Sequence, residues 1–99
     1  MDEEYLDADG YPTEVALQRV KLWPYDDARG WFDFIKSIWW AADWGWTQVN
    51  NAYDISTGGW SGNEDIIEAM RKNWGLWHHT WQEHRRGGHY KFFIPEKVI

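Results

Sequence analysis

The sequence predicts an α+β fold: one small antiparallel sheet made of two hairpins, with about three helices, in the order α-α-β-β-α-β-β. Two turn signals, Asn50-Asn51 and Arg85-Arg86-Gly87-Gly88, each separate segments in which apolar and polar residues alternate. Between these hairpins, apolar residues recur at helical spacing after Ser61, and two further stretches before them do the same. We therefore expect one sheet with helices packed on one face.

The composition indicates a single domain that covers residues 1–99, with residues 1–12 as an irregular acidic lead-in. The chain contains 10 Trp, 5 Tyr and 4 Phe, so bulky aromatic side chains can build the core of a short chain. It contains no cysteine, which excludes disulfide bonds and thiolate metal sites. The segment Asp7-Ala8-Asp9-Gly10 matches part of a calcium-binding loop, but its Gly comes fourth instead of sixth, so we expect a plain turn.

The first helix is expected from Thr13, as the N-cap, to Lys21 or Leu22. Pro24 ends it, because the residue before a proline avoids the helical conformation. Its apolar face consists of Ala16, Leu17, Val20 and Trp23.

A second, longer helix is expected from a cap at Asp26 or Asp27 to about Asp43. Trp40 and Trp44 fall on the polar side of this helix, which leaves two interpretations. The favoured one is that another element buries them; the alternative is an exposed aromatic surface that binds a partner. The core-facing stripe of this helix consists of Trp31, Phe34, Ile35, Ile38, Trp39 and Ala42.

Gly45 is expected to end this helix in a left-handed conformation. The first hairpin then pairs residues 46–49 with residues 52–56. Asn50-Asn51 forms its turn, because asparagine tolerates a positive φ.

The glycine-rich stretch from Ser56 to Asn63 leads into the most strongly indicated helix. Ser61 and Glu64 have the spacing of a capping box, and Gly75 is the expected C-terminal stop. An anion site at this turn is the alternative, but acids in the first helical turn would repel a phosphate, so a structural turn is favoured. The expected buried stripe is Ile66, Ile67, Met70 and Trp74.

Residues 76–94 are expected to form the second hairpin around Arg85-Arg86-Gly87-Gly88. The residues before the turn also fit a helix, but the turn joins two segments of matching length, which favours strands. The tip of this hairpin combines cations with aromatic rings, an arrangement that can hold a base and a phosphate. A solvated turn, where charges are expected, is the favoured interpretation. These tip residues are Arg85, Arg86, His89 and Lys91, flanked by Trp81 and Tyr90.

No metal site, cofactor or catalytic residue is expected. The spacing of His78, His79, His84 and His89 with Glu83 matches no zinc pattern, so surface histidines are favoured. Ser61 has Gly59 two residues before it but Asn63 two residues after it, which leaves a G-x-S-x-G nucleophile motif incomplete. Enzymatic activity therefore stays open and is disfavoured.

The net charge of −6 is unevenly distributed. Residues 1–70 hold 4 Lys/Arg and 14 Asp/Glu, a balance of −10, whereas residues 71–99 hold 6 and 2, a balance of +4. General nucleic-acid binding is therefore not expected, because neutralising phosphates needs clustered cations. The chain has no apolar run of membrane-spanning length, and an acidic start is unlike a signal peptide, so we expect a cytoplasmic protein without membrane contact.

Two motifs resemble a family of small uncharacterised proteins carried by phages, prophages and bacteria. They are residues 56–64, Ser-Thr-Gly-Gly-Trp-Ser-Gly-Asn-Glu, and residues 85–90, Arg-Arg-Gly-Gly-His-Tyr. The resemblance covers roughly residues 5–94. The resemblance implies a protein of the cytoplasm, which is the cytoplasm of the bacterial host if a phage carries the gene. It implies no activity and no functional residues.

Three function hypotheses follow. The first is a non-enzymatic interaction protein that binds a host protein, such as an inhibitor of a host defence or nucleic-acid-handling protein. The second is a binder of a nucleotide-like small ligand, which would use the Gly58–Asn63 turn with Arg85, Arg86 and Tyr90. The third is a small enzyme; the oligomeric state stays open, a homodimer included. The candidate ligand- or partner-binding residues are Trp40, Trp44, Gly58, Gly59, Trp60, Ser61, Asn63, Arg85, Arg86, His89 and Tyr90.

Overall fold

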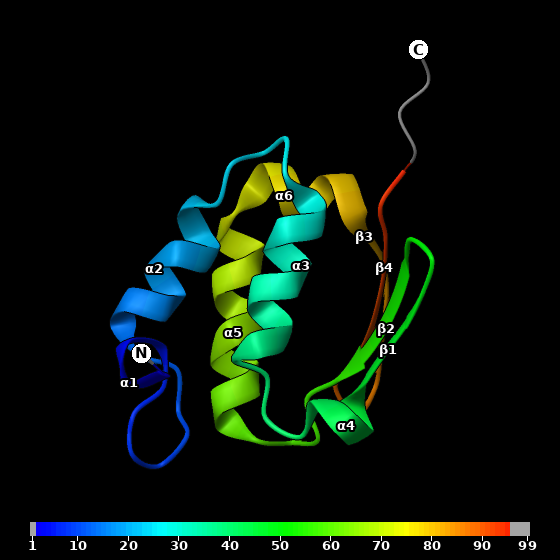
Figure 1. Cartoon of the computed structure of the whole chain (residues 1–99). Helices are drawn as coiled ribbons and strands as arrows, with labels where there is room; N and C mark the ends of the chain where they lie inside the picture. Colours follow the sequence, from blue (N-terminus) through cyan, green and yellow to red (C-terminus); the bar gives the residue numbers. More distant parts are fainter. Residues whose placement is uncertain (1, 96–99) are drawn as a thin grey trace.

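The computed structural model describes residues 2–95 and confirms the α+β fold with a four-stranded antiparallel sheet (Figure 1). In chain order the elements are α1 (Asp2–Tyr5), α2 (Glu14–Leu22), α3 (Ala28–Ser37), α4 (Ala42–Gly45), β1 (Trp46–Val49), β2 (Ala52–Ser56), α5 (Ser61–Lys72), α6 (Trp74–Thr80), β3 (Trp81–Arg85) and β4 (His89–Phe93).

Both predicted hairpins are present, and they join into one sheet with the strand order β1-β2-β4-β3. The turns form where the sequence places residues that tolerate a left-handed backbone: φ is 55° at Asn50, 87° at Gly87 and 79° at Gly88. The hairpins pair through β2 and β4, with Tyr53 opposite Phe92. The two central strands are therefore not consecutive in the chain, because α5, α6 and β3 lie between them.

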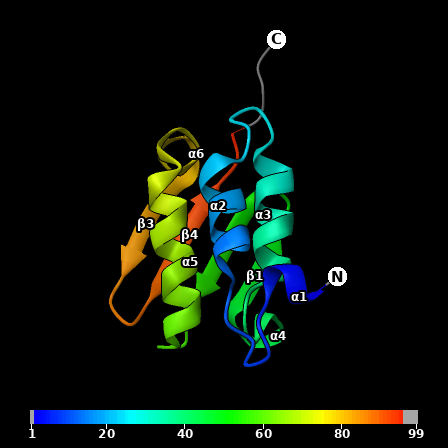
Figure 2. The same cartoon turned by 90° about the vertical axis from the view of Figure 1, so that its left-hand side faces the viewer.

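The helices lie on one face of the sheet in two layers (Figures 1 and 2). α3 and α5 pack on the sheet, and α2 lies outside them. Two buried hydrogen bonds hold α2 there, because Val20 O accepts from Trp31 Nε1 and from Asn73 Nδ2, each at 3.0 Å. Within residues 2–95 no helix covers the other face of the sheet.

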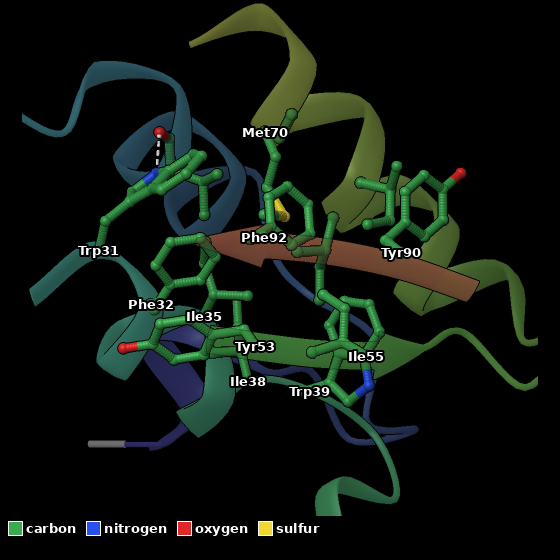
Figure 3. Packing of buried hydrophobic residues seen from close by; sticks show 14 of the residues in the cluster. Trp31, Phe32, Ile35, Ile38, Trp39, Tyr53, Ile55, Met70, Tyr90 and Phe92 are labelled. Carbon is green, nitrogen blue, oxygen red and sulfur yellow. Dashed lines mark hydrogen bonds between the residues drawn. The ribbon is translucent and has the colours of Figure 1, made fainter. Parts of the chain in front are cut away.

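Phe32 lies at the centre of the aromatic core (Figure 3), although the sequence pattern did not single it out. Its ring is fully buried and stacks on Tyr53 at a centroid distance of 4.2 Å and an angle of 17°. It also contacts Trp31 at 5.1 Å and Phe92 at 5.3 Å. The ring thus joins α3 to both central strands. Of the predicted stripe, Trp31, Ile35, Ile38 and Trp39 are buried, whereas Phe34 and Ala42 are only partly buried.

Arg29 ties the start of α3 to the end of the first hairpin. Its guanidinium donates to Tyr53 Oη at 2.9 Å, to Asn50 O at 3.3 Å, and to the side-chain oxygen of Asn51. Burial raises the pKa of the Tyr53 hydroxyl, which accepts a hydrogen bond from Arg29.

The predicted helix from Asp26 or Asp27 to Asp43 is too long. Asp27 is its N-cap and accepts from Gly30 N, as expected, but α3 ends at Ser37. The helical pattern is lost before Trp40, because Ile38 N and Trp39 N donate to the carbonyls three residues back, Ile35 O and Lys36 O. The next backbone N–H, that of Trp40, bonds the side chain of Asn63 instead of a helical carbonyl. Gly45 was predicted to adopt a left-handed conformation, but the residue that does so is Ala41. The single turn α4 follows Ala41.

The region after α5 also differs from the prediction. Gly75 does not stop a helix: Asn73 caps a new one by accepting from Leu76 N, and α6 extends to Thr80. The expected strand before the second turn is therefore restricted to β3, and the helical alternative holds for residues 76–80. Trp74, expected in the core, starts α6 and is 71% exposed.

The N-terminal segment is more regular than expected. α1 is a short helix, and Leu6 pairs with Pro12 in an isolated bridge. Asp7 forms the predicted turn by accepting from Asp9 N and Tyr11 N. α2 begins and ends as predicted, with Thr13 Oγ1 accepting from Ala16 N. In the described part of the chain, no helix has the length and apolarity needed to cross a membrane.

Replacing Phe32 should remove more stability than any exposed substitution. Phe32→Ala is expected to lower the free energy of unfolding by about 3–5 kcal/mol, because it leaves a cavity between α3 and the sheet. Leu22→Ala is the control, since Leu22 is 77% exposed. Urea denaturation checks both variants; equal losses would contradict the central position of Phe32.

Candidate functional site

Four aromatic side chains from three distant parts of the chain meet at one end of the molecule. Tyr11, Trp40, Trp44 and Trp60, together with Gly58, form what we name the aromatic platform. Trp60 stacks on Trp40 at 5.3 Å and 30°, and Tyr11 lies 4.6 Å from Trp60. Trp40 is 50% exposed and Trp44 is 69% exposed, so the favoured interpretation that these two residues are buried is wrong.

Two glycines allow the rings to lie this close to the backbone. Gly58 has φ of 66°, and a Cβ there would lie 3.2 Å from Cζ3 of Trp44 and 3.8 Å from Cζ3 of Trp40. Both indoles therefore converge over this glycine. Trp60 covers Gly62 in the same manner, since a Cβ on Gly62 would collide with the six-membered part of its indole. Any larger residue at either position would displace the rings.

Ala41 holds a strained conformation between the two exposed tryptophans. Its φ of 61° and ψ of 41° place a residue with a Cβ in the left-handed region, which costs about 1–2 kcal/mol. Its carbonyl accepts from Trp44 N at 2.9 Å and from Gly45 N at 2.8 Å, which closes the single turn α4. Strain of this kind persists where surrounding contacts impose it, and it is concentrated at functional sites.

Asn63 is the contact that imposes this arrangement. Its side chain is fully buried and accepts from Trp40 N at 2.9 Å. Its amide donates to Trp40 O at 3.0 Å and to Thr57 O at 3.3 Å. One side chain thus joins the segment after α3 to the turn before α5, and these two segments carry Trp40, Trp44 and Trp60.

The predicted capping box is absent. Ser61 is already the first residue of α5, Trp60 stands at the N-cap position, and no side chain caps the helix. The hydroxyl of Ser61 instead donates to Tyr11 Oη at 3.3 Å. Because the helix begins with its serine inside the first turn, the polar contact at this end comes from Asn63, two residues further on.

The charges around the aromatic platform are negative. The segments 39–45 and 58–65 contain Asp43, Glu64 and Asp65 and no lysine or arginine, and all three acids are exposed. The surface therefore combines flat aromatic rings with carboxylates.

The second hairpin reaches the glycine-rich turn, but its arginines do not complete a pocket there. Thr57 N donates to Gly88 O at 3.0 Å. The hollow beside this contact has a volume of about 470 Å³ and is lined by ten residues, among them Ser61, Glu64, Asp65, Glu68 and Tyr90. Arg85 lies instead in a separate hollow with Asp54, His89 and Lys91.

Two of the residues predicted to bind a ligand at this hairpin, Tyr90 and Arg85, have partners within the hairpin. Tyr90 is buried and stacks against His84 at 4.2 Å, so its ring is not available to a ligand. Arg85 binds Glu83 at 2.8 Å, and this hydrogen bond lowers the pKa of the Glu83 carboxyl. Arg86 and Gly59 are exposed.

The histidines are dispersed. His78 contacts Trp74, His79 contacts Tyr25, and His89 Nδ1 lies 2.5 Å from Ser56 Oγ on the outer face of the sheet. His78 belongs to α6, so it does not lie on the strand that carries His84. Among residues 2–95 no group of three or more His, Asp or Glu side chains is arranged to hold a metal ion.

The sequence indicated Trp40, Trp44, Gly58, Trp60 and Asn63 as candidates, and the structure brings these five together. The sequence analysis missed Tyr11, whose hydroxyl accepts from Ser61. Tyr11 lies 50 positions before Ser61, and no local sequence pattern indicates this contact. Comparisons with protein-family models, curated proteins and solved structures found no match to this chain.

Asn63 and Ser61 offer a direct test of how this end is held. Asn63→Ala should lower the free energy of unfolding by about 1–3 kcal/mol, because it removes the partner of both backbone groups of Trp40 and one of the two donors to Thr57 O. Ser61→Ala should cost less than about 0.5 kcal/mol, since this hydroxyl caps nothing. Urea denaturation and near-ultraviolet circular dichroism check both; a larger loss for Ser61→Ala would restore the capping box.

Proposed function

We propose that this protein is a non-enzymatic interaction protein that binds a basic surface of a partner protein through the aromatic platform. The observation that supports this most strongly is the exposure of Trp40 and Trp44 on a segment that Asn63 holds in place.

A purely structural role for Trp40 and Trp44 does not explain why both indoles are exposed. Trp44 contributes its indole largely to solvent, and the core closes without it. Tryptophan is strongly enriched among residues that dominate binding energy, and pre-ordered side chains lose less entropy on binding. The backbone strain at Ala41 also supports a binding role, because the strained conformation holds the neighbouring indoles of Trp40 and Trp44 at the surface.

The charges indicate the chemistry of the partner. Asp43, Glu64 and Asp65 are exposed on the two segments that carry Trp40, Trp44 and Trp60, and residues 1–70 carry 4 basic and 14 acidic side chains. Arginine and lysine side chains bind the faces of indole rings and pair with carboxylates. A partner surface rich in these cations would be complementary and would be attracted over longer range.

The phage-type setting that the two sequence motifs imply extends the proposal. Proteins that handle nucleic acids expose cationic surfaces, often with aromatic residues on which bases stack. An acidic surface with flat rings offers both kinds of contact that such proteins make. We therefore infer a host defence or nucleic-acid-handling protein in the bacterial cytoplasm as the partner, and competition with nucleic acid as the effect.

A nucleotide-like ligand is the weaker alternative. The hollow between the glycine-rich turn and the second hairpin is bordered by Glu64, Asp65 and Glu68, which would repel phosphate. Arg71 is the one arginine or lysine among its lining residues, because Arg85 lies in the other hollow. An enzyme is weaker still: Ser56 Oγ lies 2.5 Å from His89 Nδ1, but this pair is exposed on the outer face of the sheet, where water is not excluded.

The proposal predicts which tryptophans are needed for binding. The tagged protein is used to capture partners from a bacterial lysate, and the affinity of the protein identified is then measured with purified components by calorimetry. Trp40→Ala/Trp44→Ala should weaken binding by about 30-fold or more, as expected for hot-spot residues.

Trp74→Ala is the matched control, because Trp74 is 71% exposed and Trp44 is 69% exposed. This control should retain wild-type affinity. An unchanged affinity of the double variant, or an equal loss in Trp74→Ala, would remove the aromatic platform from the interaction.

A further inference from the structure

The outer face of the sheet is a second surface for which the fold provides no cover. The helices lie on the inner face, toward which Tyr53, Ile55 and Phe92 point (Figures 1 and 3). Strand alternation places the other residues outward. The outward-facing residues are Thr47 and Val49 on β1, Ala52, Asp54 and Ser56 on β2, Glu83 and Arg85 on β3, and His89, Lys91 and Phe93 on β4.

The strand register arranges these side chains in rows across the sheet. The middle row runs Thr47, Asp54, Lys91 and Glu83 from β1 to β3, with Lys91 Nζ 4.0 Å from an Asp54 carboxylate oxygen. Its two central positions thus carry opposite charges. A surface that binds nucleic acid would instead gather cations of one sign.

The neighbouring row is apolar and combines large and small side chains. Val49 pairs with Ala52, and Ala52 pairs with Phe93. Val49 is 64% exposed and Phe93 is 38% exposed. On the central strands, a small residue of β2 therefore lies beside a large one of β4, which leaves a depression next to a projection.

From this arrangement we propose that the outer face binds the same face of a second copy of this chain. The two-fold axis runs parallel to the strands, between β2 and β4. Rotation about this axis places β2 of one copy over β4 of the other while positions along the strands are kept. Asp54 then faces Lys91 of the second copy, and Lys91 faces its Asp54.

The same operation fits the apolar row. Phe93 of each copy lies over Ala52 of the other, so the large side chain enters the space that the small one leaves. A two-fold interface requires a surface that is complementary to itself. The charged row with Asp54 and Lys91 and the apolar row with Ala52 and Phe93 both meet this condition. Packed sheets cross at about 30°, so contacts near the axis, on β2 and β4, stay closest.

This dimer would also affect the proposed partner binding, although it uses a different surface and does not depend on it. An axis parallel to the strands keeps both copies in the same sense along the strand direction. The two aromatic platforms, which lie beyond the end of β2, would therefore be at the same end of the dimer. Two linked sites can bind a repetitive partner far more tightly than one.

Charge reversal on the two central strands tests the proposal by analytical ultracentrifugation. The wild-type protein should form a dimer of about twice 11.9 kDa with rising concentration. Asp54→Lys and Lys91→Asp should each weaken dimerisation by about 10-fold or more, because each places like charges opposite one another twice. Asp26→Lys and Lys72→Asp, exposed charges away from this face, serve as controls.

Mixing the two single variants separates contacts between copies from contacts within one copy. Each single variant carries like charges at positions 54 and 91, yet a mixed dimer pairs opposite charges at both contacts. The mixture should therefore dimerise, and so should the double variant Asp54→Lys/Lys91→Asp. A monomer at every concentration, a dimer that the single variants do not weaken, or a mixture that fails to associate would each overturn the proposal.

Discussion

The hydrogen bonds of Asn63 are the constraint on which the functional end of this molecule depends. The side chain is fully buried, and it satisfies both backbone groups of Trp40 as well as the carbonyl of Thr57. These bonds hold the segment between α3 and α4 and fix the turn before α5 at the same time. A buried amide costs free energy unless its donors and acceptor are satisfied, so this end has one arrangement rather than several.

The core supports that end from behind. Phe32 joins α3 to β2 and β4, while Trp39 packs on Trp46 and donates from Nε1 to Ser56 O at 3.2 Å. The residue after Trp39 therefore leaves the core at a fixed point. Large aromatic side chains give a short chain enough buried surface to hold such a segment firmly.

The sequence predicted the features that local chemistry decides, and it failed where distant residues decide. Asn50 and the pair Gly87-Gly88 identified both turns, because a positive φ is a property of the residue itself. The end of α3 was missed because the segment that follows it is held by Asn63, 23 positions from Trp40, and no local pattern reveals that contact. The sequence indicated five residues of this end as candidates, but it did not indicate that Tyr11 joins them, because that contact also depends on a distant part of the chain. The exposure of Trp40 and Trp44 was misjudged because another element was expected to bury them, although helical spacing placed both on the polar side.

The most direct test of the account is a map of the indole N–H signals in two-dimensional ¹⁵N–¹H NMR spectra when the purified partner is added. The ten tryptophans provide one Nε1–H reporter each. Binding at the aromatic platform predicts that the signals of Trp40, Trp44 and Trp60 shift, while those of the buried Trp31 and the distant Trp74 stay in place. Shifts confined to Trp74 or Trp81, with the three platform signals unchanged, would contradict it.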